Sequence, residues 1–309
     1  MELYQIDIKP SGGFYTPIKG DTLFGIFCWA VVDRFGEQRL TELLEGYTEN
    51  KPFIVISDAF PQGFLPKPVL PFPYYKKAED GSEPDAKKRK EFKRREWLPA
   101  DKISLPTNRM ADLFAEVPFM EKSLKTTNSV NPETNHAGGG KYSAYKTEMI
   151  SYHGFLTVYA VIDETRISSA DVETLFRQIG QSGYGKKASS GGGKFSVESV
   201  KPVSLSSSAE TTALMTLAPC VPVSDEFDAD KSFYKVFVRF GRHGNRAALS
   251  ENPFKNPVMT MDTGAVLTPK TEKTPLFVGT GVTGVSLSDP RTVFQGYAPV
   301  VALNAKETE

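Results

Sequence analysis

The side chains best suited to chemistry lie in the stretch GQSGYGKKASSGGGKF, residues 180–195. Lys186, Lys187 and Lys194 supply positive charge, and Ser189 and Ser190 add neutral hydrogen-bond donors. The glycines between them allow backbone amides to approach an anion closely. Residues of these types in this order are typical of a loop that binds phosphate, so the question is which molecule carries the phosphate.

Two nucleotide-binding motifs are partly matched here, and both fail. Residues 183–188 fit the relaxed dinucleotide fingerprint, but that motif must follow a strand and open a helix. The segment before the loop instead has apolar residues at helical spacing, with Ser168 and Asp171 as a capping box and Gly180 at the expected left-handed cap. Phe195 stands where a P-loop needs Ser or Thr, and it begins a predicted strand. The loop therefore connects a helix to a strand.

The elements that must position this loop follow from hydrophobic periodicity. Residues 4–8 alternate as in a strand, and a helix begins near residue 21 with an inner face made of Leu23, Phe27, Ala30 and Val31. Residues 46–73 are rich in proline and aromatic residues, which predicts irregular chain, and residues 154–163 predict another strand. The order strand, helix, irregular or hairpin material, strand, helix, strand predicts a ferredoxin-like α+β unit with a large insertion around residues 46–150.

Two segments of this insertion have a distinct composition. Residues 87–95 hold seven basic residues and one acid. A solvated helix or a disordered excursion is the simplest interpretation of this charge, and a nucleic-acid contact is the alternative. Residues 124–147 are polar and rich in turn signals, which predicts a long hairpin.

The second half of the chain is predicted to be rich in strands. A serine-rich stretch at residues 204–210 suggests a boundary, which gives domains 1–204 and 205–309. The segments LMTLAPCVPV, FYKVFVRFG, GVTGVSL and GYAPVVAL are strand-like, and no long amphipathic helix is predicted after residue 205.

Composition restricts the class of protein. The 309 residues include 37 Lys plus Arg and 37 Asp plus Glu, a balance that argues against a freely acting, nonspecific nucleic-acid binder. Cys28 and Cys220 form no disulfide framework, so we expect the reducing cytoplasm. The apolar run of residues 23–32 is about half the length that spans a bilayer, and no signal peptide is recognised, so we expect no membrane association.

Signals for catalysis are poor. His136, His153 and His243 are far apart and have no metal-ligand spacing, although His153 beside Tyr152 could serve as an RNA-cleaving acid/base pair. Residues 163–164 form a single carboxylate pair, which is too little for a metal site. We therefore expect no catalytic residue, no metal and no cofactor.

Signals for binding are better. Three arginines lie in residues 238–248, and Tyr142, Tyr145 and Tyr184 could stack on bases. The first predicted helix adds an N-terminus that favours an anion near Lys19, with capping of the helix by Asp21 as the alternative role of this segment. Together with the ferredoxin-like order, these features predict RNA binding.

Four stretches suggest a family: PIKGDTLFGIFCWAV, GYGKKASSGGGKF, PVMTMDTGAVL and FQGYAPVV. Together they resemble the RAMP superfamily of CRISPR RNA-binding proteins, and more narrowly the subunit that caps the crRNA 5′ handle in Csm-type (type III-A) effector complexes. The loop departs from the wider superfamily pattern, with lysines and Ala188 where arginine and glycine are frequent.

This resemblance implies a non-catalytic protein with two ferredoxin-like (RRM-like) domains. It implies binding to the crRNA 5′ handle and docking onto a large polymerase-type subunit and a repeated backbone RAMP subunit. One hairpin is then expected to act as a thumb between nucleotides, with residues 124–147 as the first choice and the charged insertion as the second. The residues expected to contact RNA are Lys19, Gly20, Asp21, Thr22, Asn128, His136, Lys141, Tyr142, Gly183, Tyr184, Gly185, Lys186, Lys187, Ser189, Ser190, Gly191, Gly192, Gly193, Lys194 and Arg242.

Two other functions fit the same sequence. A CRISPR repeat-cleaving endoribonuclease that needs no metal would use His153 or His136 with a tyrosine or a lysine. A scaffold would bind only proteins through its basic loops.

Overall fold

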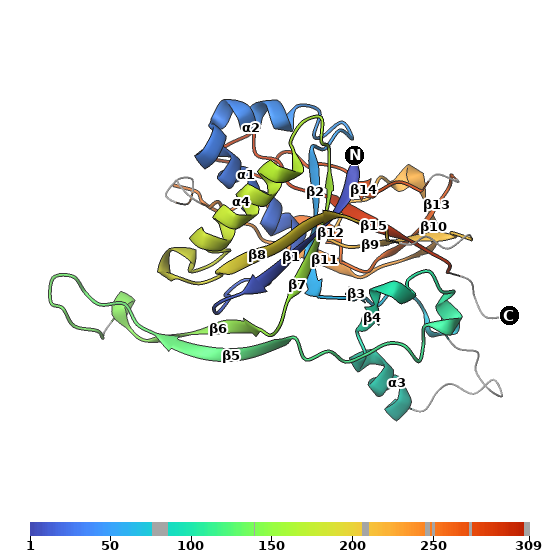
Figure 1. The fold of residues 1–309 in the computed structure, drawn as a ribbon. Helices are drawn as coiled ribbons and strands as arrows, with labels where there is room; N and C mark the ends of the chain where they lie inside the picture. The colour runs from blue at the N-terminus through green and yellow to red at the C-terminus, as the bar shows by residue number, and fades with distance from the viewer. Residues whose placement is uncertain are drawn as a thin grey trace.

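The computed structural model describes residues 1–75, 86–138, 140–205, 210–244, 248, 251–271 and 274–305. Two antiparallel sheets form its body (Figure 1). The first sheet has the order β2-β7-β1-β8, from β1 (Glu2–Pro10), β2 (Ile54–Pro61), β7 (Leu156–Ile162) and β8 (Phe195–Pro202). The second sheet has the order β10-β13-β9-β15-β14, from β9 (Ala213–Thr216), β10 (Phe227–Phe233), β13 (Val266–Pro269), β14 (Phe277–Gly279) and β15 (Tyr297–Leu303).

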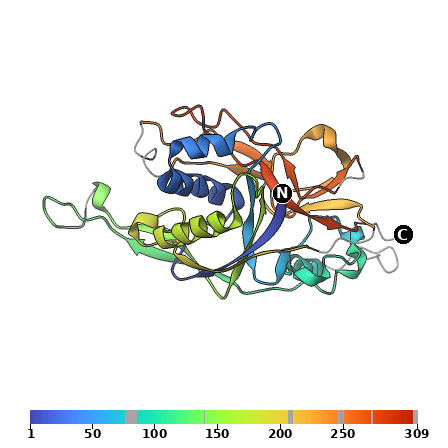
Figure 2. The same ribbon diagram turned by 45° about the horizontal axis from the view of Figure 1, so that its top comes forward.

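Helices α1 (Gly20–Phe35) and α4 (Ser169–Ser182) lie side by side on one face of the first sheet, and the short α2 (Glu37–Leu44) follows α1 (Figures 1 and 2). The predicted inner face of α1 is buried, and Ser168 caps α4 by accepting a hydrogen bond from the Asp171 amide. Along the chain these elements follow the order β1-α1-β2-β7-α4-β8. The predicted strands and helices are confirmed as β1, α1, β7, α4 and β8, and β2 is an additional strand.

Three sequence-based expectations about local structure are wrong. β2 lies within residues 46–73, which were expected to be irregular, and so the predicted insertion contains a strand of the first sheet. Helix α4 continues past Gly180 and ends at Gly183, whose φ is 98°. Gly180 instead allows close packing, because a Cβ there would lie 2.1 Å from the Phe195 carbonyl oxygen. The stretch GVTGVSL forms no strand; it contributes isolated bridges at Val282 and Ser286.

The second half is built from strands, as expected. The ribbon of β11 (Val236–Arg239) and β12 (Val258–Met261) lies beside the five-stranded sheet. Among the described residues after 205 there is no α-helix, so the helices of a second ferredoxin-like unit are not seen there. One hydrophobic core nevertheless includes residues of both sheets, such as Ile6 and Val158 with Met215 and Val301.

The insertion after β2 has two parts. One part packs against the body and contains the pair β3 (Phe64–Pro66) and β4 (Trp97–Pro99) and helix α3 (Ala86–Arg94). The other is the predicted long hairpin, formed by β5 (Met120–Thr127) and β6 (Tyr145–Tyr152), which projects from the body (Figures 1 and 2). Short 3₁₀ helices complete the chain: η1 (Phe72–Tyr74), η3 (Ala100–Lys102), η4 (Thr107–Arg109), η5 (Gly140–Tyr142), η6 (Ala188–Ser190) and η7 (Ser224–Glu226). In the described part of the chain, no helix is both long and apolar enough to cross a membrane.

Candidate nucleic-acid interface

The glycine-rich loop between α4 and β8 folds tightly on itself. The Tyr184 amide donates to the Gly193 carbonyl at 2.8 Å, and the Gly193 amide donates to the Gly13 carbonyl at 2.9 Å. A Cβ on Gly193 would lie 2.1 Å from the Tyr184 carbonyl oxygen, and a Cβ on Gly183 would lie 2.4 Å from that of Gly192. These glycines are therefore required for contacts inside the protein, rather than only for the approach of an anion.

Several amides of the loop are already used. The Lys186 amide donates to the Thr16 hydroxyl at 3.0 Å, and the amides of residues 188 and 190–192 donate to carbonyls of the loop itself. Backbone donors thus contribute less to an anion site here than the sequence suggested. The loop instead presents side chains to solvent, since Lys186, Ser189, Ser190 and Lys194 are exposed.

Lys187 joins the loop to the root of the projecting hairpin. Its Nζ donates to the Thr127 hydroxyl at 3.0 Å and lies 5.0 Å from the centre of the Tyr15 ring and 5.1 Å from that of Tyr145. A cation near two ring faces is favourable, yet both rings remain partly open to solvent. We call Tyr15, Thr16, Thr127, Tyr145 and residues 183–194 the loop–hairpin site.

The hairpin is fixed at this site by its base. Phe14 and Ile150 exchange two backbone hydrogen bonds, at 2.8 and 2.7 Å, and both side chains are buried. The Tyr152 hydroxyl accepts a hydrogen bond from the Ile18 amide at 3.3 Å. Further out the hairpin is a two-stranded ribbon with exposed side chains, among them Leu124 at 68% exposure.

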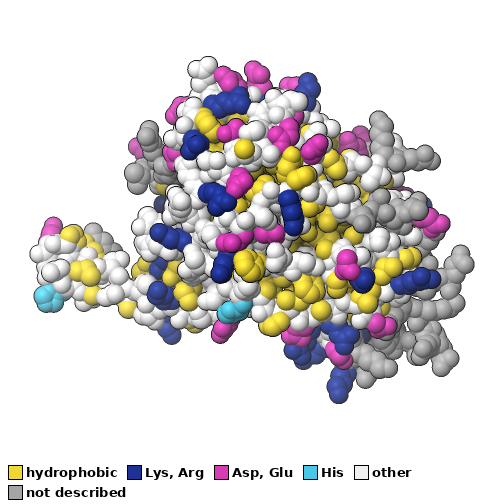
Figure 3. All heavy atoms as spheres, viewed as in Figure 1, with side chains coloured by type: hydrophobic (Ala, Val, Ile, Leu, Met, Phe, Trp, Pro, Cys, Tyr) yellow, Lys and Arg dark blue, Asp and Glu magenta, His cyan; other side chains and the backbone are white. Residues whose placement is uncertain are grey.

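The loop–hairpin site is electropositive. The Thr127 hydroxyl and the charge of Lys187 lower the pKa of the Tyr145 hydroxyl below its ordinary value. Figure 3 shows Lys and Arg side chains gathered where the hairpin leaves the body. Exposed cations beside exposed rings can bind phosphates and stack on bases, which is the pattern of single-stranded nucleic-acid binding.

Tyr184 requires a correction, because it was expected to stack on a base. Its side chain is fully buried, and its hydroxyl accepts from the Lys19 amide at 3.1 Å and donates to the Pro17 carbonyl at 2.8 Å. The residue therefore joins the loop to the start of α1. Tyr145, at 46% exposure, is the tyrosine of this site that a base can reach.

Lys19 also differs from expectation. Its Nζ donates to Asp58 Oδ2 at 2.9 Å and to Asp262 Oδ1 at 2.8 Å, so two carboxylates compensate its charge. Burial on its own would lower the pKa of Lys19, but the Asp58 and Asp262 carboxylates outweigh burial and hold this pKa above its ordinary value. Thr263 adds a hydroxyl that donates to Asp58.

The N-terminus of α1 is likewise occupied. The Gly20 amide donates to Asp58 Oδ1 at 2.8 Å, and the Thr22 amide donates to Asp21 Oδ1 at 2.7 Å. Asp21 is buried, and its carboxylate accepts two hydrogen bonds from the Arg239 guanidinium, from Nε at 2.5 Å and from Nη2 at 2.7 Å. The anion that a helix N-terminus favours is thus supplied by the protein. We call Lys19, Asp21, Asp58, Arg239, Asp262 and Thr263 the charged junction, and residues 19–22 offer no open phosphate site beside the loop.

Contacts inside the protein account for three of the four stretches that carried the family resemblance. Residues 17–31 and 257–267 meet in the charged junction through Lys19 and Asp262. The third stretch supplies Gln295, which is fully buried and bonds both backbone groups of Ile56 on β2, at 2.9 and 2.8 Å. These motifs join the two sheets, whereas the glycine loop is the stretch that faces outward.

The remaining predicted residues lie elsewhere. Asn128 directly follows β5, and His136, Lys141 and Tyr142 lie in the segment that joins β5 to β6. This segment forms the outer end of the hairpin (Figure 1). Arg242 lies beside β11 with its guanidinium 5.6 Å from the centre of the Phe254 ring. Of the other arginines in that stretch, Arg239 belongs to the charged junction, and Arg246 falls outside the described residues.

The histidines do not assemble an acid/base pair. His243 is buried, with Nε2 2.7 Å from the Ser286 hydroxyl. His153 is exposed, but the neighbouring Tyr152 hydroxyl is held by the Ile18 amide, and burial raises the pKa of Tyr152. His136 lies at the hairpin tip against the Thr134 carbonyl. Within the described residues, no group of three His, Cys, Asp or Glu side chains could hold a metal ion.

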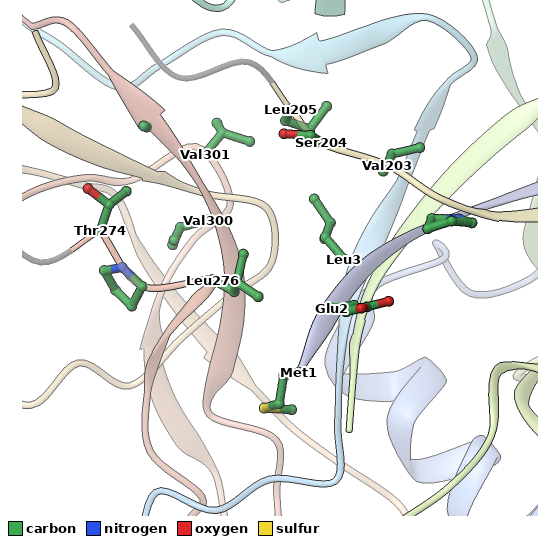
Figure 4. A pocket seen from close by; sticks show the side chains of 13 residues that line it. Met1, Glu2, Leu3, Val203, Ser204, Leu205, Thr274, Leu276, Val300 and Val301 are labelled. Atoms are coloured by element: carbon green, nitrogen blue, oxygen red, sulfur yellow. The ribbon is translucent and has the colours of Figure 1, made fainter. Parts of the chain in front are cut away.

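A cavity of about 850 Å³ opens between the two sheets (Figure 4). It lies at the start of β1 and the end of β8, whereas the loop–hairpin site lies at the opposite ends of these strands. The start of β1, the chain after β8, residues 274–276 and β15 form its walls. Its side chains are mostly aliphatic, such as Leu3, Val203, Leu276 and Val300, so it suits an apolar group rather than chemistry.

Sequence reasoning missed Tyr15, Thr16 and Thr127 as parts of the site. Tyr15 and Thr16 follow the glycine pair Gly12-Gly13, a turn signal next to an aromatic residue that could have pointed to them. For Thr127 the sequence gives no signal, because its contact with Lys187 spans 60 residues.

Comparison with known proteins finds solved structures with a similar fold. No protein-family model matches the chain, and no curated relative matches it by sequence. Among solved structures, a chain of the "Csm1-Csm4 cassette in complex with pppApA" matches with 16% identity, a TM-score of 0.58 and 100% coverage of both chains. A chain of the "Csm3-Csm4 subcomplex in the type III-A CRISPR-Cas interference complex" matches with 15% identity, a TM-score of 0.58, and coverage of 98% of this chain and 100% of that one.

A third match, at 12% identity and a TM-score of 0.52, covers 85% of this chain and 86% of a chain in "the Type III-B Cmr-beta bound to cognate target RNA and AMPPnP". Csm4 is the component that the cassette and the subcomplex have in common. The chain therefore has a mixed α/β, Csm4-like fold over its whole length, and the resemblance seen in its sequence is confirmed at the level of fold.

Proposed function

We propose that this chain is a non-catalytic, RNA-binding subunit of a type III-A CRISPR effector complex in the cytoplasm, and that its loop–hairpin site holds the crRNA 5′ handle. The observation that carries the proposal is Lys187, held by Thr127 between the partly open rings of Tyr15 and Tyr145 in a chain with a Csm4-like fold. A fixed RNA tag is recognised by phosphate contacts and by stacking, and this site offers both.

The phosphate contacts come from Lys186, Lys187 and Lys194, with the Ser189 and Ser190 hydroxyls beside them. The same backbone turn carries all of them, so they face one stretch of RNA together. Tyr145 and Tyr15 offer ring faces next to these cations. The β5–β6 hairpin acts as the thumb that separates nucleotides, with its exposed Leu124 as an apolar wedge.

The proposal assigns two protein partners: a large Csm1-like subunit and a Csm3-like backbone subunit. The similar structures are binary assemblies of Csm4 with each of these. The outward face of the β11–β12 ribbon supports a chain that works inside an assembly, because Val236, Phe240 and Met259 are 61%, 78% and 69% exposed. The first sheet with α1 and α4 is taken as a ferredoxin-like unit, and the five-stranded sheet as the second unit.

Salt-dependent RNA binding by the full-length protein tests this function. Labelled handle RNA is titrated with the wild type, with Lys186→Ala/Lys187→Ala/Lys194→Ala, and with a control that replaces the exposed Lys51, Lys201 and Lys270 by Ala. Each phosphate contact on a single strand contributes about 0.7 to the magnitude of the slope of log K against log salt. With three contacts removed, the slope of the loop variant should be smaller in magnitude than that of the wild type by about 2. The control should keep the slope of the wild type.

The two other functions give different results in the same assay. Scaffolding alone predicts no affinity of the wild type for handle RNA. An endoribonuclease predicts cleavage of repeat RNA in the presence of a chelator, and loss of this cleavage in His153→Ala or His136→Ala. Equal slopes for the loop variant and the control would reject the loop–hairpin site.

A further inference from the structure

Helix α3 in the charged insertion carries four cations on one side. At about 100° per residue, Lys87, Lys90, Lys93 and Arg94 all lie about 100° or more around the helix from its one large apolar residue, Phe92. All four side chains are exposed. We call these four residues the α3 basic face.

The helix is held against the body through Phe92. The Phe92 ring meets the rings of Phe72, Tyr75 and Phe114 edge-on, at 5.4 to 5.7 Å between centres. Lys67 adds its Nζ 4.4 Å from the centre of the Phe92 ring and donates to the Phe92 carbonyl. The charged insertion is therefore not a free excursion over residues 86–95, because a cluster of four rings fixes its helix.

This arrangement has a cost that other parts of the molecule must offset. A helix of nine residues is too short to be stable alone in water, and like charges one turn apart destabilise it further. Two ion pairs relieve part of the repulsion, Arg94 with Glu116 at 3.1 Å and Arg95 with Glu91 at 2.6 Å. Lys90 and Lys93 have no carboxylate partner in the described part of the chain.

We infer that the α3 basic face is a second RNA-binding surface, which contacts the phosphate backbone of single-stranded RNA without reading its sequence. The charge of the face is complementary to a polyanion, and the four side chains that define it are all charged, whereas the core of a protein interface is depleted in charged residues. Figures 1 and 2 show α3 on the opposite side of the molecule from the hairpin tip, so this surface is separate from the loop–hairpin site. That the polyanion is RNA rests on the proposed function.

The test compares two variants of the full-length protein on two labelled RNAs. One RNA carries the 5′ handle followed by an unpaired guide segment, and the other is the guide segment alone. Lys90→Ala/Lys93→Ala should lower the salt slope by about 1.4 for either RNA, as expected for two lost contacts on a single strand. The Lys51/Lys201/Lys270 control should match the wild type.

The outcomes separate this inference from the proposed function. If Lys90→Ala/Lys93→Ala keeps the salt slope of the wild type while the loop variant has a smaller slope, the α3 surface is rejected and handle binding remains. If only the α3 variant changes, the handle site is rejected and the α3 surface remains. An unchanged slope together with weaker co-purification of a protein subunit would also overturn the inference, since the face would then bind protein.

A second variant tests whether the helix must be held in place. Phe92→Ala keeps every cation but removes the ring that fixes α3, so proteolysis within residues 87–95 should become faster. RNA affinity should fall severalfold, with a smaller change in the salt slope than for the lysine variant. If proteolysis becomes faster while the affinity stays that of the wild type, the α3 basic face does not act as a fixed surface.

Discussion

Lys19 in the charged junction and Lys187 in the loop–hairpin site look alike in sequence, since each stands next to a glycine-containing turn. In the structure their roles are opposite. Lys19 is compensated by Asp58 and Asp262, at 2.9 and 2.8 Å, whereas Lys187 contacts a hydroxyl and two rings. Charge that is paired within the chain stabilises the fold, and charge without a carboxylate partner is left for a ligand.

A similar difference divides the glycines, but it lies within the loop rather than between the two regions. Gly20 at the charged junction and Gly193 in the loop both lie against backbone, since a Cβ would come within 2.2 Å and 2.1 Å of a carbonyl oxygen. Gly191 in the loop has nothing within 4 Å of the same position. A binding loop therefore contains both kinds of glycine, and the kind that holds the loop together is found by its contacts.

The largest effect should come from the charged junction. Lys19→Met leaves Asp58 and Asp262 facing each other without a cation. Because Asp58 is buried while Lys19 and Asp262 are partly exposed, the cost should be about 3 kcal/mol, the lower end of the range for a buried pair. Chemical denaturation measures this loss in the free energy of unfolding. Lys186→Ala, the exposed control, should change it by less than about 0.5 kcal/mol. Similar losses for the two variants would remove the distinction between the regions.

A smaller effect should separate two glycines of the loop. Gly193→Ala and Gly191→Ala both place a side chain at positive φ, 71° and 84°, which costs about 1–2 kcal/mol in each case. Only Gly193→Ala adds a clash with the Tyr184 backbone, so it should cost clearly more and should also abolish handle binding. Thermal unfolding and RNA titration of both variants check this. Equal costs would mean that the loop adapts freely.

Stability and binding should depend on different properties of Lys187. This residue has a φ of 63°, a strained conformation that glycine adopts without cost. Lys187→Gly should therefore have a free energy of unfolding about 1 kcal/mol higher than that of Lys187→Ala, which loses the same side-chain contacts. Lys187→Gly should also weaken handle binding by about 1–2 kcal/mol, through loss of a charged contact. Lys187→Ala separates the two effects, because it removes the charge and keeps the strain. Equal free energies of unfolding for the two variants would show that the conformation of residue 187 is not strained.

The smallest expected effect concerns pH. Because the pKa of Lys19 is raised in the folded state, its contribution is fully present below the ordinary lysine pKa and is lost only as pH rises through the folded value. The difference in unfolding free energy between wild type and Lys19→Met should therefore be equal at about pH 6 and about pH 9, and it should shrink only above about pH 10.5. If the difference in unfolding free energy already declines between about pH 6 and about pH 9, Asp58 and Asp262 do not raise the pKa of Lys19.

Much of the fold follows from local patterns. Alternation predicted β1, and helical spacing with a Ser168 cap predicted α4, because one buried face imposes a period on the sequence. β2 was missed for a physical reason: both of its faces are covered, so its sequence does not alternate, and the buried polar residues Ser57 and Asp58 interrupt its apolar residues beside many prolines. The expected strand at residues 281–287 has the right composition but only isolated bridges.

The candidate site is less predictable, because its contacts are long-range. The loop itself was found from its lysines and glycines. The burial of Tyr184 was not, and neither was the pairing of Lys19 with carboxylates 39 and 243 residues away. Residue type shows which side chains are able to bind phosphate, but packing between distant segments decides which of them are free to do so.

Photocrosslinking shows whether handle RNA lies on the loop–hairpin site. Handle RNA with photoreactive nucleotides is bound to the full-length protein, irradiated, and the labelled peptides are identified by mass spectrometry. We expect labelling at Tyr15, Tyr145 and residues 183–194, and none at residues 19–22, whose charges and amides are already paired. Labelling of residues 19–22 without labelling of the loop would contradict this assignment.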